Sequence, residues 1–427
     1  MPLYLALGSP TTELTSDQLR EALIGVLSDL GPRRRVLAVP PDHSRAASRA
    51  GELTCMVHDY YGDALVDVLP ALGTHEEIST KHREKMFPTI PANLFRYHNW
   101  RTDVETIGTV PAEFVTEVTE GIYREPWPAQ LNRLISQGGH DLVLSLGQVV
   151  PHEVIGMANY NKNIFVGTGG VRGINESHYI GAVYGMERIM GEGNTPLRKI
   201  LNYAQDHFCR HLPLLYVLTV IGPNNAGKSV VRGLFIGDDA ECFWKACDLA
   251  FAVNVTTVPA PFKKCVVYLD PEKFPSTWLG NKAIYRTRMA MADDGELIIL
   301  APGVRTFGED SEIDRLIRKY GYMTTPEIIG AVAANAELRD NLSAPAHLIH
   351  GSSEKRFRIT YCPGELSRAE INNACYEFGD LAEYSRHYDV NKLADGWNTT
   401  ADGEELFFVR DPAMGLWKYM AGAPTGR

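Results

Sequence analysis

The sequence has little of what marks exported, membrane-spanning or nucleic-acid-binding proteins. Its seven cysteines contain no CxxC pair, and their odd number leaves at least one unpaired within the chain. No basic segment precedes the first apolar run, and no stretch approaches the roughly 18 uninterrupted apolar residues of a membrane span. Basic residues are also in deficit, with 42 Lys and Arg against 52 Asp and Glu. We therefore expect a cytoplasmic protein with reduced thiols that binds neither nucleic acid nor membrane.

What the sequence does have is the pattern of an α/β protein. Apolar runs that predict strands alternate with amphipathic stretches that predict helices. A chain of 427 residues, 44% of them hydrophobic, can form more than one domain. Residues 256–264, which include Pro259 and Pro261, are the best candidate linker. We predict two α/β domains, 1–258 and 259–427, with the active site in the cleft between them.

The individual elements follow from the same periodicity. The predicted strands are 3–7, 35–39, 142–146, 215–221, 230–236, 265–269, 296–300 and 357–361. The predicted helices are 16–30, 128–136, 177–189, 240–252 and 284–292. The strand 35–39 ends directly before Pro40-Pro41-Asp42, and open α/β sheets hold ligands at such strand ends.

One segment, Gly222-Pro223-Asn224-Asn225-Ala226-Gly227-Lys228-Ser229, matches the phosphate-binding P-loop pattern. A P-loop must run directly into a helix whose amino terminus faces the phosphates. The residues that follow, 230–236, are β-branched and apolar and include Gly233, which favours a strand. Two apolar runs around a polar turn describe a β-hairpin, in which Asn and Gly supply positive φ angles. We predict the hairpin, and the alternative is a nucleoside triphosphatase that uses Lys228 and Asp270.

Three further segments share an order along the chain. They are Pro41-Asp42-His43-Ser44-Arg45, Tyr97-His98-Asn99-Trp100-Arg101, and Pro151-His152 followed by Gly167-Thr168-Gly169-Gly170. In this order they resemble the lactate racemase family of nickel-pincer enzymes, which has an Asp-x-[ST]-Arg segment, a middle His, and a Pro-His before a [ST]-Gly-Gly-x-Lys loop. The resemblance implies a racemase or epimerase that inverts C2 of a 2-hydroxy acid by reversible hydride transfer to a nickel-pincer nucleotide. This cofactor is pyridinium-3,5-bisthiocarboxylic acid mononucleotide nickel.

The resemblance also implies roles for residues that would meet the substrate. His98 and His152 are the expected acid/base pair, because the two enantiomers present their hydroxyl to different sides and imidazole titrates near neutral pH. Arg45 and Lys273 are expected to bind the substrate carboxylate. Trp100 and the Asn-rich residues 158–163 favour a hydroxyl-rich or larger acid, such as a sugar acid, over lactate.

The expected cofactor site departs from the family at one position. Where the family loop has a lysine that anchors the cofactor through a thioamide bond, this chain has Val171-Arg172. We expect Arg172 to pair with the cofactor phosphate and to hold the nucleotide noncovalently. Lys162 is an alternative that would reach the same spot from another backbone position. The other residues expected at the cofactor are Asp42, Ser44, Thr168, Gly169 and Gly170.

Nickel needs one ligand from the protein, since the pincer leaves one position of a square plane open and a neutral imidazole suits it. His178 is the expected ligand. Gly73-Thr74-His75 also resembles a family Gly-Thr-His segment, although a helix cap explains it equally well. The proteins that make the cofactor are expected partners. A cofactor carrier without catalytic activity is a further alternative, in which loss of His98 and His152 would be tolerated.

Overall fold

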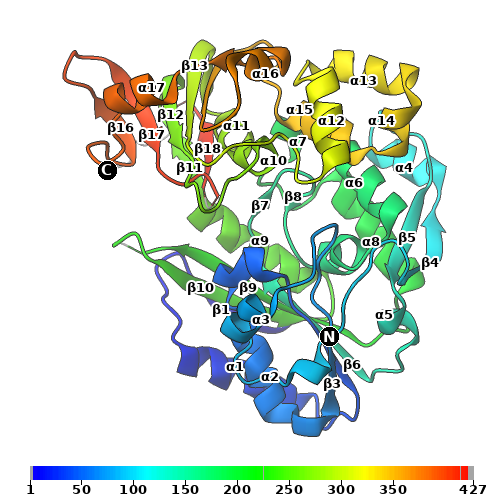
Figure 1. The fold of residues 1–427 in the computed structure, drawn as a ribbon. Coiled ribbons are helices and arrows are strands. Elements are labelled where there is room, and N and C mark those ends of the chain that lie inside the picture. Colours follow the sequence, from blue (N-terminus) through cyan, green and yellow to red (C-terminus); the bar gives the residue numbers. More distant parts are fainter. Residues whose placement is uncertain (1–2, 225, 414, 422–427) are drawn as a thin grey trace. The chain divides into compact units, whose positions relative to one another are not determined.

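The computed structural model describes residues 3–224, 226–413 and 415–421. The chain forms two compact units, each with its own six-stranded sheet. The first unit comprises Met1–Tyr184 and Arg188–Asn254, and the second comprises Gly185–Glu187 and Val255–Arg427. Figure 1 shows the helices and strands of both units. The predicted α/β fold class is confirmed.

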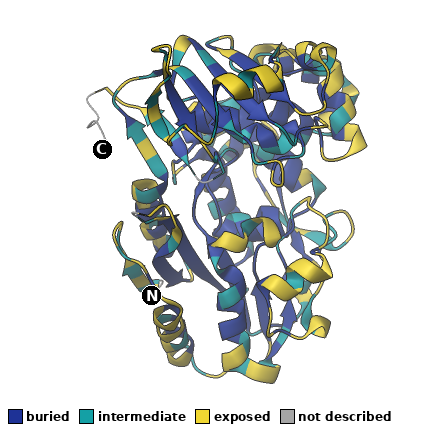
Figure 2. Cartoon of the chain, turned by 60° about the vertical axis from the view of Figure 1, so that its left-hand side comes forward, coloured by how far each residue is buried: buried dark blue, intermediate teal, exposed yellow. Residues whose placement is uncertain are grey.

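The sheet of the first unit is mostly parallel. Its strands are β1 (Leu3–Gly8), β2 (Val36–Val39), β3 (Leu65–Val68), β6 (Leu142–Gln148), β9 (Leu214–Pro223) and β10 (Ser229–Gly237). They lie in the order β1-β10-β9-β6-β2-β3, and the last four run parallel while β10 and β1 pair antiparallel. Figure 2 shows that the strands are mostly buried, as expected of parallel strands covered on both faces. The carboxyl ends of β2, β3, β6 and β9 therefore lie at one edge of the sheet.

Helices and short strands complete the first unit. The helices are α1 (Ser16–Asp29), α2 (Ala50–Tyr61), α3 (Thr80–Met86), α4 (Ala112–Val118), α5 (Arg133–Gln137), α6 (Val171–Tyr184), α8 (Pro196–Phe208) and α9 (Ala240–Asn254), and α7 (Met186–Ile189) contains residues of both units. Two antiparallel pairs are β4 (Val104–Val110) with β5 (Trp127–Asn132), and β7 (Pro151–His152) with β8 (Gly156–Met157). Three 3₁₀-helices span His43–Ser48, Gly62–Ala64 and Ala92–Leu94, and a π-helix spans Asn163–Gly167. Helix α9 packs on β9 and β10, and α2 packs on β3 and β6.

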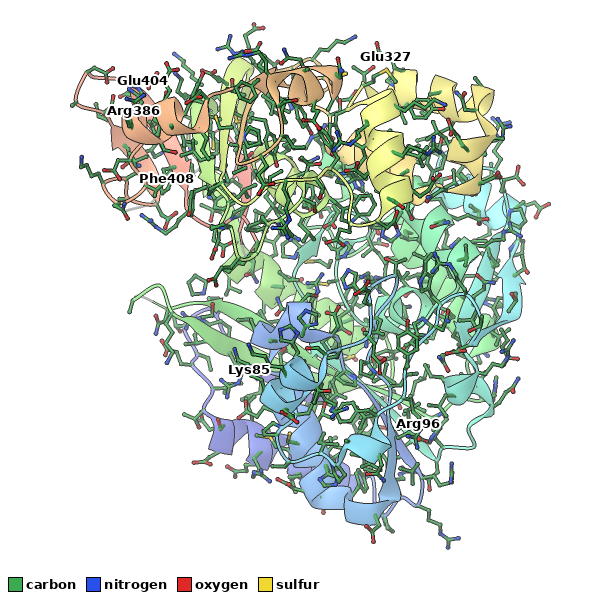
Figure 3. The ribbon with its side chains drawn as sticks, in the orientation of Figure 1. Lys85, Arg96, Glu327, Arg386, Glu404 and Phe408 are labelled. Carbon is green, nitrogen blue, oxygen red and sulfur yellow. The ribbon has the colours of Figure 1, made fainter. Side chains whose placement is uncertain are left out.

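A buried ion-pair cluster ties β3 to the segments before β4 and β6. Asp67 of β3 accepts His140 Nε2 at 2.9 Å through one carboxylate oxygen and lies 2.7 Å from Arg96 Nε through the other. His140 is enclosed, whereas Arg96 reaches the surface (Figure 3). The two partners together satisfy a carboxylate that is almost fully buried.

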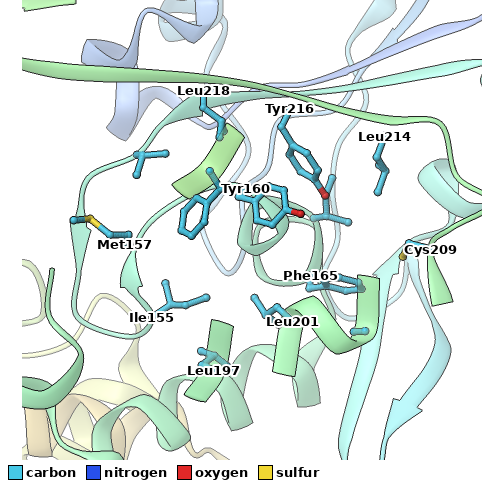
Figure 4. Close-up of a cluster of buried hydrophobic side chains, with 14 of the residues drawn as sticks. Ile155, Met157, Tyr160, Phe165, Leu197, Leu201, Cys209, Leu214, Tyr216 and Leu218 are labelled. Carbon is cyan, nitrogen blue, oxygen red and sulfur yellow. The ribbon is translucent and has the colours of Figure 1, made fainter. Parts of the chain in front are cut away.

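The main core of the first unit lies between its sheet and helices α8 and α9. Leu197 and Leu201 of α8 and Tyr216 of β9 belong to this cluster of buried side chains. Tyr160 lies among them, with its ring centroid 4.3 Å from that of Tyr216 and 5.2 Å from that of Phe243, at separations typical of packed aromatic pairs. Figure 4 shows Tyr160 beside Tyr216. The core thus holds the segment that precedes the π-helix.

The second unit has a parallel sheet with one antiparallel edge strand. Its strands are β12 (Phe262–Tyr268), β13 (Met291–Ala301), β14 (Arg358–Pro363), β15 (Glu377–Phe378), β16 (Gly396–Thr399) and β17 (Glu405–Val409), in the order β15-β14-β13-β12-β17-β16 with β16 antiparallel. A separate parallel pair joins β11 (Val255–Val258) to β18 (Leu416–Tyr419). The helices are α10 (Thr277–Gly280), α11 (Lys282–Thr287), α12 (Ser311–Tyr320), α13 (Thr325–Ala334), α14 (Ala336–Asp340), α15 (Ser343–His350), α16 (Arg368–Asn373) and α17 (Leu381–His387). None of the helices in the described residues is both long enough and apolar enough to cross a bilayer.

The segment that matches the P-loop pattern is a hairpin turn. Strands β9 and β10 pair antiparallel, and Pro223 and Ser229 form the pair next to the turn. Within the turn, Gly227 has a φ of +75°. Within the turn, Asn224 Oδ1 accepts the backbone N–H groups of Ala226 and Lys228 at 3.0 Å each, and Asn225 lies outside the described residues. Because a strand follows the turn where a P-loop requires a helix, the predicted hairpin is confirmed and the P-loop alternative is wrong.

Four other predictions need correction. Residues 128–136 do not form one helix, because residues up to Asn132 pair with β4 and Asn132 then caps α5. The expected linker 256–264 lies largely in β11 and β12, and β11 pairs with the distant β18. The helix expected at 177–189 begins at Val171 and is broken at Gly185. The helix expected at 284–292 ends at Thr287, before β13.

Candidate active site

Backbone hydrogen bonds join the segments that leave β2 and β3 to the π-helix. Ala71 N–H donates to Pro40 O at 2.8 Å, and Gly73 N–H donates to Gly167 O at 2.7 Å. The side-chain amide of Asn163 donates to Val39 O and Ser145 Oγ at 3.0 Å each. The π-helix, a rare form often found at functional sites, is therefore fixed against the ends of the parallel strands.

Asp42 and His75 form a hydrogen-bonded dyad at this edge. Asp42 is buried and caps the 3₁₀-helix that contains Arg45, since its Oδ1 accepts from Ser44 N–H at 3.1 Å and from Ser44 Oγ. Its other oxygen accepts His75 Nδ1–H at 2.5 Å. Burial raises the pKa of Asp42, but the hydrogen bonds from His75 and Ser44 outweigh it and leave the pKa below its ordinary value. The bond holds Nδ1 of His75 against the carboxylate, so Nε2 is the ring nitrogen left for other partners.

His152 is enclosed and neutral. Its Nδ1 accepts the backbone N–H of Val154 at 3.1 Å, so its proton lies on Nε2. Burial moves the pKa of His152 well below its ordinary value. Glu153 opposes this shift, and the positive charges of Lys162 and Arg45 add to it. His152 therefore presents an N–H group at Nε2.

His178 has the reverse arrangement of His152. It is half-buried on α6, and its Nδ1–H donates to the carbonyl oxygen of Ile174, one turn earlier, at 2.7 Å. Burial lowers the pKa of His178, although the bond to Ile174 opposes the shift. The imidazole is thus neutral at physiological pH with its lone pair on Nε2. A ligating histidine has this form, with its other ring N–H held by a backbone carbonyl or a carboxylate.

Two cations in the same region lack carboxylate partners. Neither Arg45 nor Lys162 lies within 4.0 Å of a carboxylate among the residues that the structure describes. Burial lowers the pKa of the Lys162 amine to about 8, and the charge of Arg45 adds to this effect. The charge of Lys162 in turn affects His152 and His178, and that of His75 also affects His178. The structure thus brings together a set of six residues, which we call the histidine cluster: Asp42, Arg45, His75, His152, Lys162 and His178.

No protein-family model matches the sequence, and no curated protein matches it significantly. Solved structures match over nearly the whole chain. A crystal structure of a Thermotoga maritima protein from a structural genomics consortium has a TM-score of 0.80 at 23% identity, covering 98% of this chain and 100% of that one. The lactate racemase apoprotein from Thermoanaerobacterium thermosaccharolyticum has a TM-score of 0.71 at 16% identity, covering 97% and 94%. This chain has a lactate racemase-like fold.

Within this lactate racemase-like fold, His98 does not have the geometry expected of an acid/base residue. It is fully buried, its Nε2–H donates to Gly169 O at 3.1 Å, and its Nδ1 accepts from the side-chain amide of Asn132 at 3.0 Å. Burial lowers the pKa of His98 to about 4. Both ring nitrogens are occupied by protein groups, so His98 joins the glycine loop to the start of α5. This geometry argues against the proton transfer expected of His98, which stays a prediction.

The glycine loop packs against protein and is not an open cradle. Thr168 Oγ1 donates to Ile164 O at 2.6 Å. A Cβ at Gly169 would lie 2.0 Å from Phe165 O, and one at Gly170 would lie 2.7 Å from the side chain of Gln130. These glycines are therefore required by internal close packing, and their expected role at a phosphate stays a prediction.

Arg172 also differs from expectation. Its exposed side chain donates to Glu176 Oε1 through Nε at 3.1 Å and through Nη2 at 2.8 Å, one turn later on α6. A guanidinium that is already paired with a carboxylate is a poor candidate for a phosphate anchor. Lys162, the alternative in the sequence, belongs to the histidine cluster.

Two expected substrate residues have other partners. Lys273 belongs to the second unit, where its Nζ donates to Asp411 at 2.8 Å and lies 3.7 Å from Asp270. Trp100 is half-buried, and the guanidinium of Arg101 stacks on its ring at 3.8 Å from the centroid.

Among the described residues, no group of three or more His, Cys, Asp or Glu side chains is arranged to hold a metal ion.

The sequence patterns favoured other residues over His75 and Lys162, and they did not single out Asn163. Gly73-Thr74-His75 is not a helix cap, because Ser79 caps α3. Lys162 directly precedes the π-helix, a position that the glycine pattern did not single out. Asn163 belongs to the Asn-rich residues 158–163, but that pattern did not point to the two buried hydrogen bonds with which it holds the π-helix.

Proposed function

We propose that this protein is an isomerase that inverts C2 of a 2-hydroxy acid and that it uses a nickel-pincer nucleotide. The observation that carries the proposal is the state of His178, a neutral imidazole with its Nδ1–H bound to Ile174 O and its Nε2 lone pair in a cluster of acid/base and cationic groups. The lactate racemase-like fold and the order of the sequence segments support the same conclusion.

The chain's residues fit the cofactor that the resemblance implies. His178 Nε2 is a nitrogen donor suited to a square-planar nickel ion. The Lys162 amine has a pKa of about 8, so about a tenth of it is uncharged and nucleophilic at pH 7, far more than for an ordinary lysine. We therefore assign the anchoring role to Lys162 in place of Arg172. When bound, the cofactor supplies the acceptor for the hydride that leaves C2.

The remaining cluster residues handle the substrate. Arg45, with no described carboxylate partner, binds the substrate carboxylate through its planar guanidinium. His75 Nε2 would accept the hydroxyl proton of either enantiomer and return it to the product, and Asp42 would stabilise the imidazolium that forms. His152 Nε2–H would hydrogen-bond to the same oxygen and keep it beside His75 while the planar 2-keto acid turns its other face. In this mechanism His75 alone transfers the proton that was first expected of the His98 and His152 pair.

The proposal is tested by nickel content and by chirality. The protein is coexpressed with the cofactor-biosynthesis enzymes, and nickel per chain is measured for the wild type, His178→Ala and His207→Ala. His207 is a matched control, because it also donates Nδ1–H to the carbonyl one turn earlier, Tyr203 O at 2.8 Å, but is exposed on α8. We expect about one nickel per chain in the wild type and the control, and a large loss in His178→Ala.

The loaded protein is then given single enantiomers of lactate, dicarboxylic 2-hydroxy acids and sugar acids. Inversion of at least one of them is the expected result, and Lys162 carries the cofactor mass in a peptide digest. A folded wild type that binds no nickel would refute the proposal. Nickel binding without inversion of any acid would instead favour a cofactor carrier.

A further inference from the structure

The turn before Lys162 contains two consecutive residues in the left-handed region. Asn159 has a φ of +64° and Tyr160 a φ of +58°. Asparagine tolerates this conformation, but a bulky aromatic residue rarely adopts it. Such a backbone persists only where surrounding groups hold it, and it is common where a functional group must be placed. The groups that hold this turn therefore bear on the position of Lys162.

One of these groups is a buried cation from α8. Arg198 is fully buried, and its guanidinium donates to Met157 O at 2.8 Å, to Asn159 O at 3.2 Å and to the side-chain oxygen of Asn161. Its Cζ lies 4.0 Å above the ring of Phe243. No carboxylate among the described residues pairs with it within 4.0 Å. A buried charge is costly without partners, and here the partners are the oxygens of the turn.

Two of the three oxygens belong to Met157 and Asn161, which flank the left-handed pair, and the third is the carbonyl oxygen of Asn159 within it. Binding the carbonyls of Met157 and Asn159 at one guanidinium fixes the orientation of the peptide groups on either side of residues 158 and 159. The aromatic core holds the other end of the pair, because Tyr160 is enclosed there and its hydroxyl accepts from Gln205 Nε2 at 2.8 Å. Lys162 follows two residues later.

We propose that Arg198 is a positioning residue that holds the Met157–Asn161 turn in its left-handed form and thereby fixes where Lys162 presents its amine. The role of Lys162 as the anchor rests on the proposed function, but the positioning itself is a property of this chain alone. The hydrogen bonds of the guanidinium carry the effect, and a side chain that fills the same space without donors does not replace it.

The test compares Arg198→Met, which keeps the length of the side chain without its donors, with Arg198→Lys, which keeps the charge but reaches fewer acceptors. Hydrogen exchange of residues 157–163 and acetylation of Lys162 at pH 9 are measured by mass spectrometry. Acetylation of the exposed Lys85 (Figure 3) is the internal reference. In Arg198→Met we expect at least tenfold faster exchange in the turn and at least fivefold faster acetylation of Lys162, with a smaller change in Arg198→Lys.

A second substitution separates positioning from core filling. Alanine disfavours a φ near +64° and lacks the Asn159 Oδ1 that accepts the Tyr160 N–H at 2.7 Å, so Asn159→Ala alone is expected to speed acetylation of Lys162 as Arg198→Met does. Filling of the core at position 198 is unaffected by residue 159, so a purely structural role of Arg198 predicts no such agreement. Asn159→Gly, which loses the same hydrogen bond but adopts this φ without strain, is the matched control.

The results lead to clear decisions. Faster exchange and acetylation in both Arg198→Met and Asn159→Ala support the proposal. Unchanged turn exchange in a folded Arg198→Met variant, or equal changes throughout the first unit, would overturn it. If Arg198→Met does not fold, Arg198→Lys together with Asn159→Ala decides in the same way. No readout here involves nickel, so a wild type without nickel refutes the proposed function and leaves this inference standing.

Discussion

The enclosure of His98 makes a quantitative prediction about acid stability. Burial lowers its pKa from an ordinary value of 6.5 to about 4 in the folded chain. The unfolded chain therefore binds a proton on this imidazole at a pH where the folded chain does not. The stability associated with neutral His98 is complete above pH 6.5 and is lost as the pH falls toward 4. The full loss amounts to about 3 kcal/mol, of which about 2 kcal/mol is lost between pH 7 and pH 5.

The perturbation that reveals this loss is His98→Gln. Glutamine keeps a donor and an acceptor but does not titrate, and at pH 7 we expect it to lower the free energy of unfolding by about 1–3 kcal/mol through imperfect bonds to Gly169 and Asn132. At pH 5 the difference between wild type and variant is expected to be smaller by about 2 kcal/mol. Urea unfolding at pH 7, 6 and 5, followed by fluorescence and circular dichroism, measures it.

His211→Gln provides the control, because His211 is exposed and its replacement leaves the core intact. All other titrating groups are common to the wild type and His98→Gln, so their effects cancel in the difference. A difference that stays constant from pH 7 to pH 5 would show that His98 is not enclosed as described. The reasoning that removes it from the acid/base pair would then fail as well.

Three further predictions concern the ion-pair cluster, the hairpin and the dyad. Asp67→Asn is expected to lower the free energy of unfolding by about 2–3 kcal/mol, because it weakens charge-assisted bonds to His140 and Arg96, and thermal and urea unfolding measure the loss. Lys228→Ala is expected to change stability by less than about 0.5 kcal/mol, and calorimetry with magnesium ATP is expected to detect no binding in either form, since Lys228 is exposed on a hairpin turn. In the nickel-loaded protein, His75→Gln is expected to lower kcat/KM by about 10²–10⁴, measured by chiral chromatography with an acid that the wild type inverts.

Each of these has a control or an opposing result. Asp59→Asn removes an exposed ion pair with Arg20 and is expected to cost less than about 1 kcal/mol. Magnesium-dependent ATP binding that Lys228→Ala abolishes would contradict the hairpin interpretation. His98→Gln in the same loaded protein is expected to keep kcat/KM within about tenfold of the wild type, and the opposite order of the two histidine variants would restore the first assignment.

Much of the fold was predictable because its signals are local. The strands β2, β6 and β9 are short apolar runs, and the hairpin between β9 and β10 is marked by Asn and Gly in its turn. The failures occurred where distant pairing decides the structure. The sequence of β5 predicts part of a helix, and only its pairing with β4 makes it a strand. Strand β11 pairs with β18, which lies near the carboxyl end of the chain.

The residues of the candidate site also divide into those with a local sequence signal and those whose place depends on distant contacts. Asp42, Arg45, His152 and His178 were singled out from short segments, and the structure places them in one cluster. His98 could not be separated from His75 by sequence, because the groups that enclose His98 lie 71 and 34 residues away along the chain. The search for a glycine loop led to residues 168–170 and away from Lys162.

A physical reason explains that last failure. Sequence reasoning looks for glycine wherever the backbone must be left-handed, but this turn uses Asn159 and Tyr160 instead. The conformation is supported by Arg198 and by the aromatic core, which are both remote in sequence. The tertiary contacts of Arg198 and the aromatic core hold the left-handed backbone here, where a glycine would adopt it through its own conformational preference.

The hydrogen bond that fixes His178 comes from the main chain of its own helix. Because the acceptor is a carbonyl, every residue type at position 174 supplies it, and only a distortion of α6 removes it. Many ligating histidines depend on a carboxylate elsewhere in the protein, which must be retained together with the ligand. Here the orientation of the imidazole follows from the helix itself, so the surrounding side chains can change without releasing the His178 Nδ1–H group.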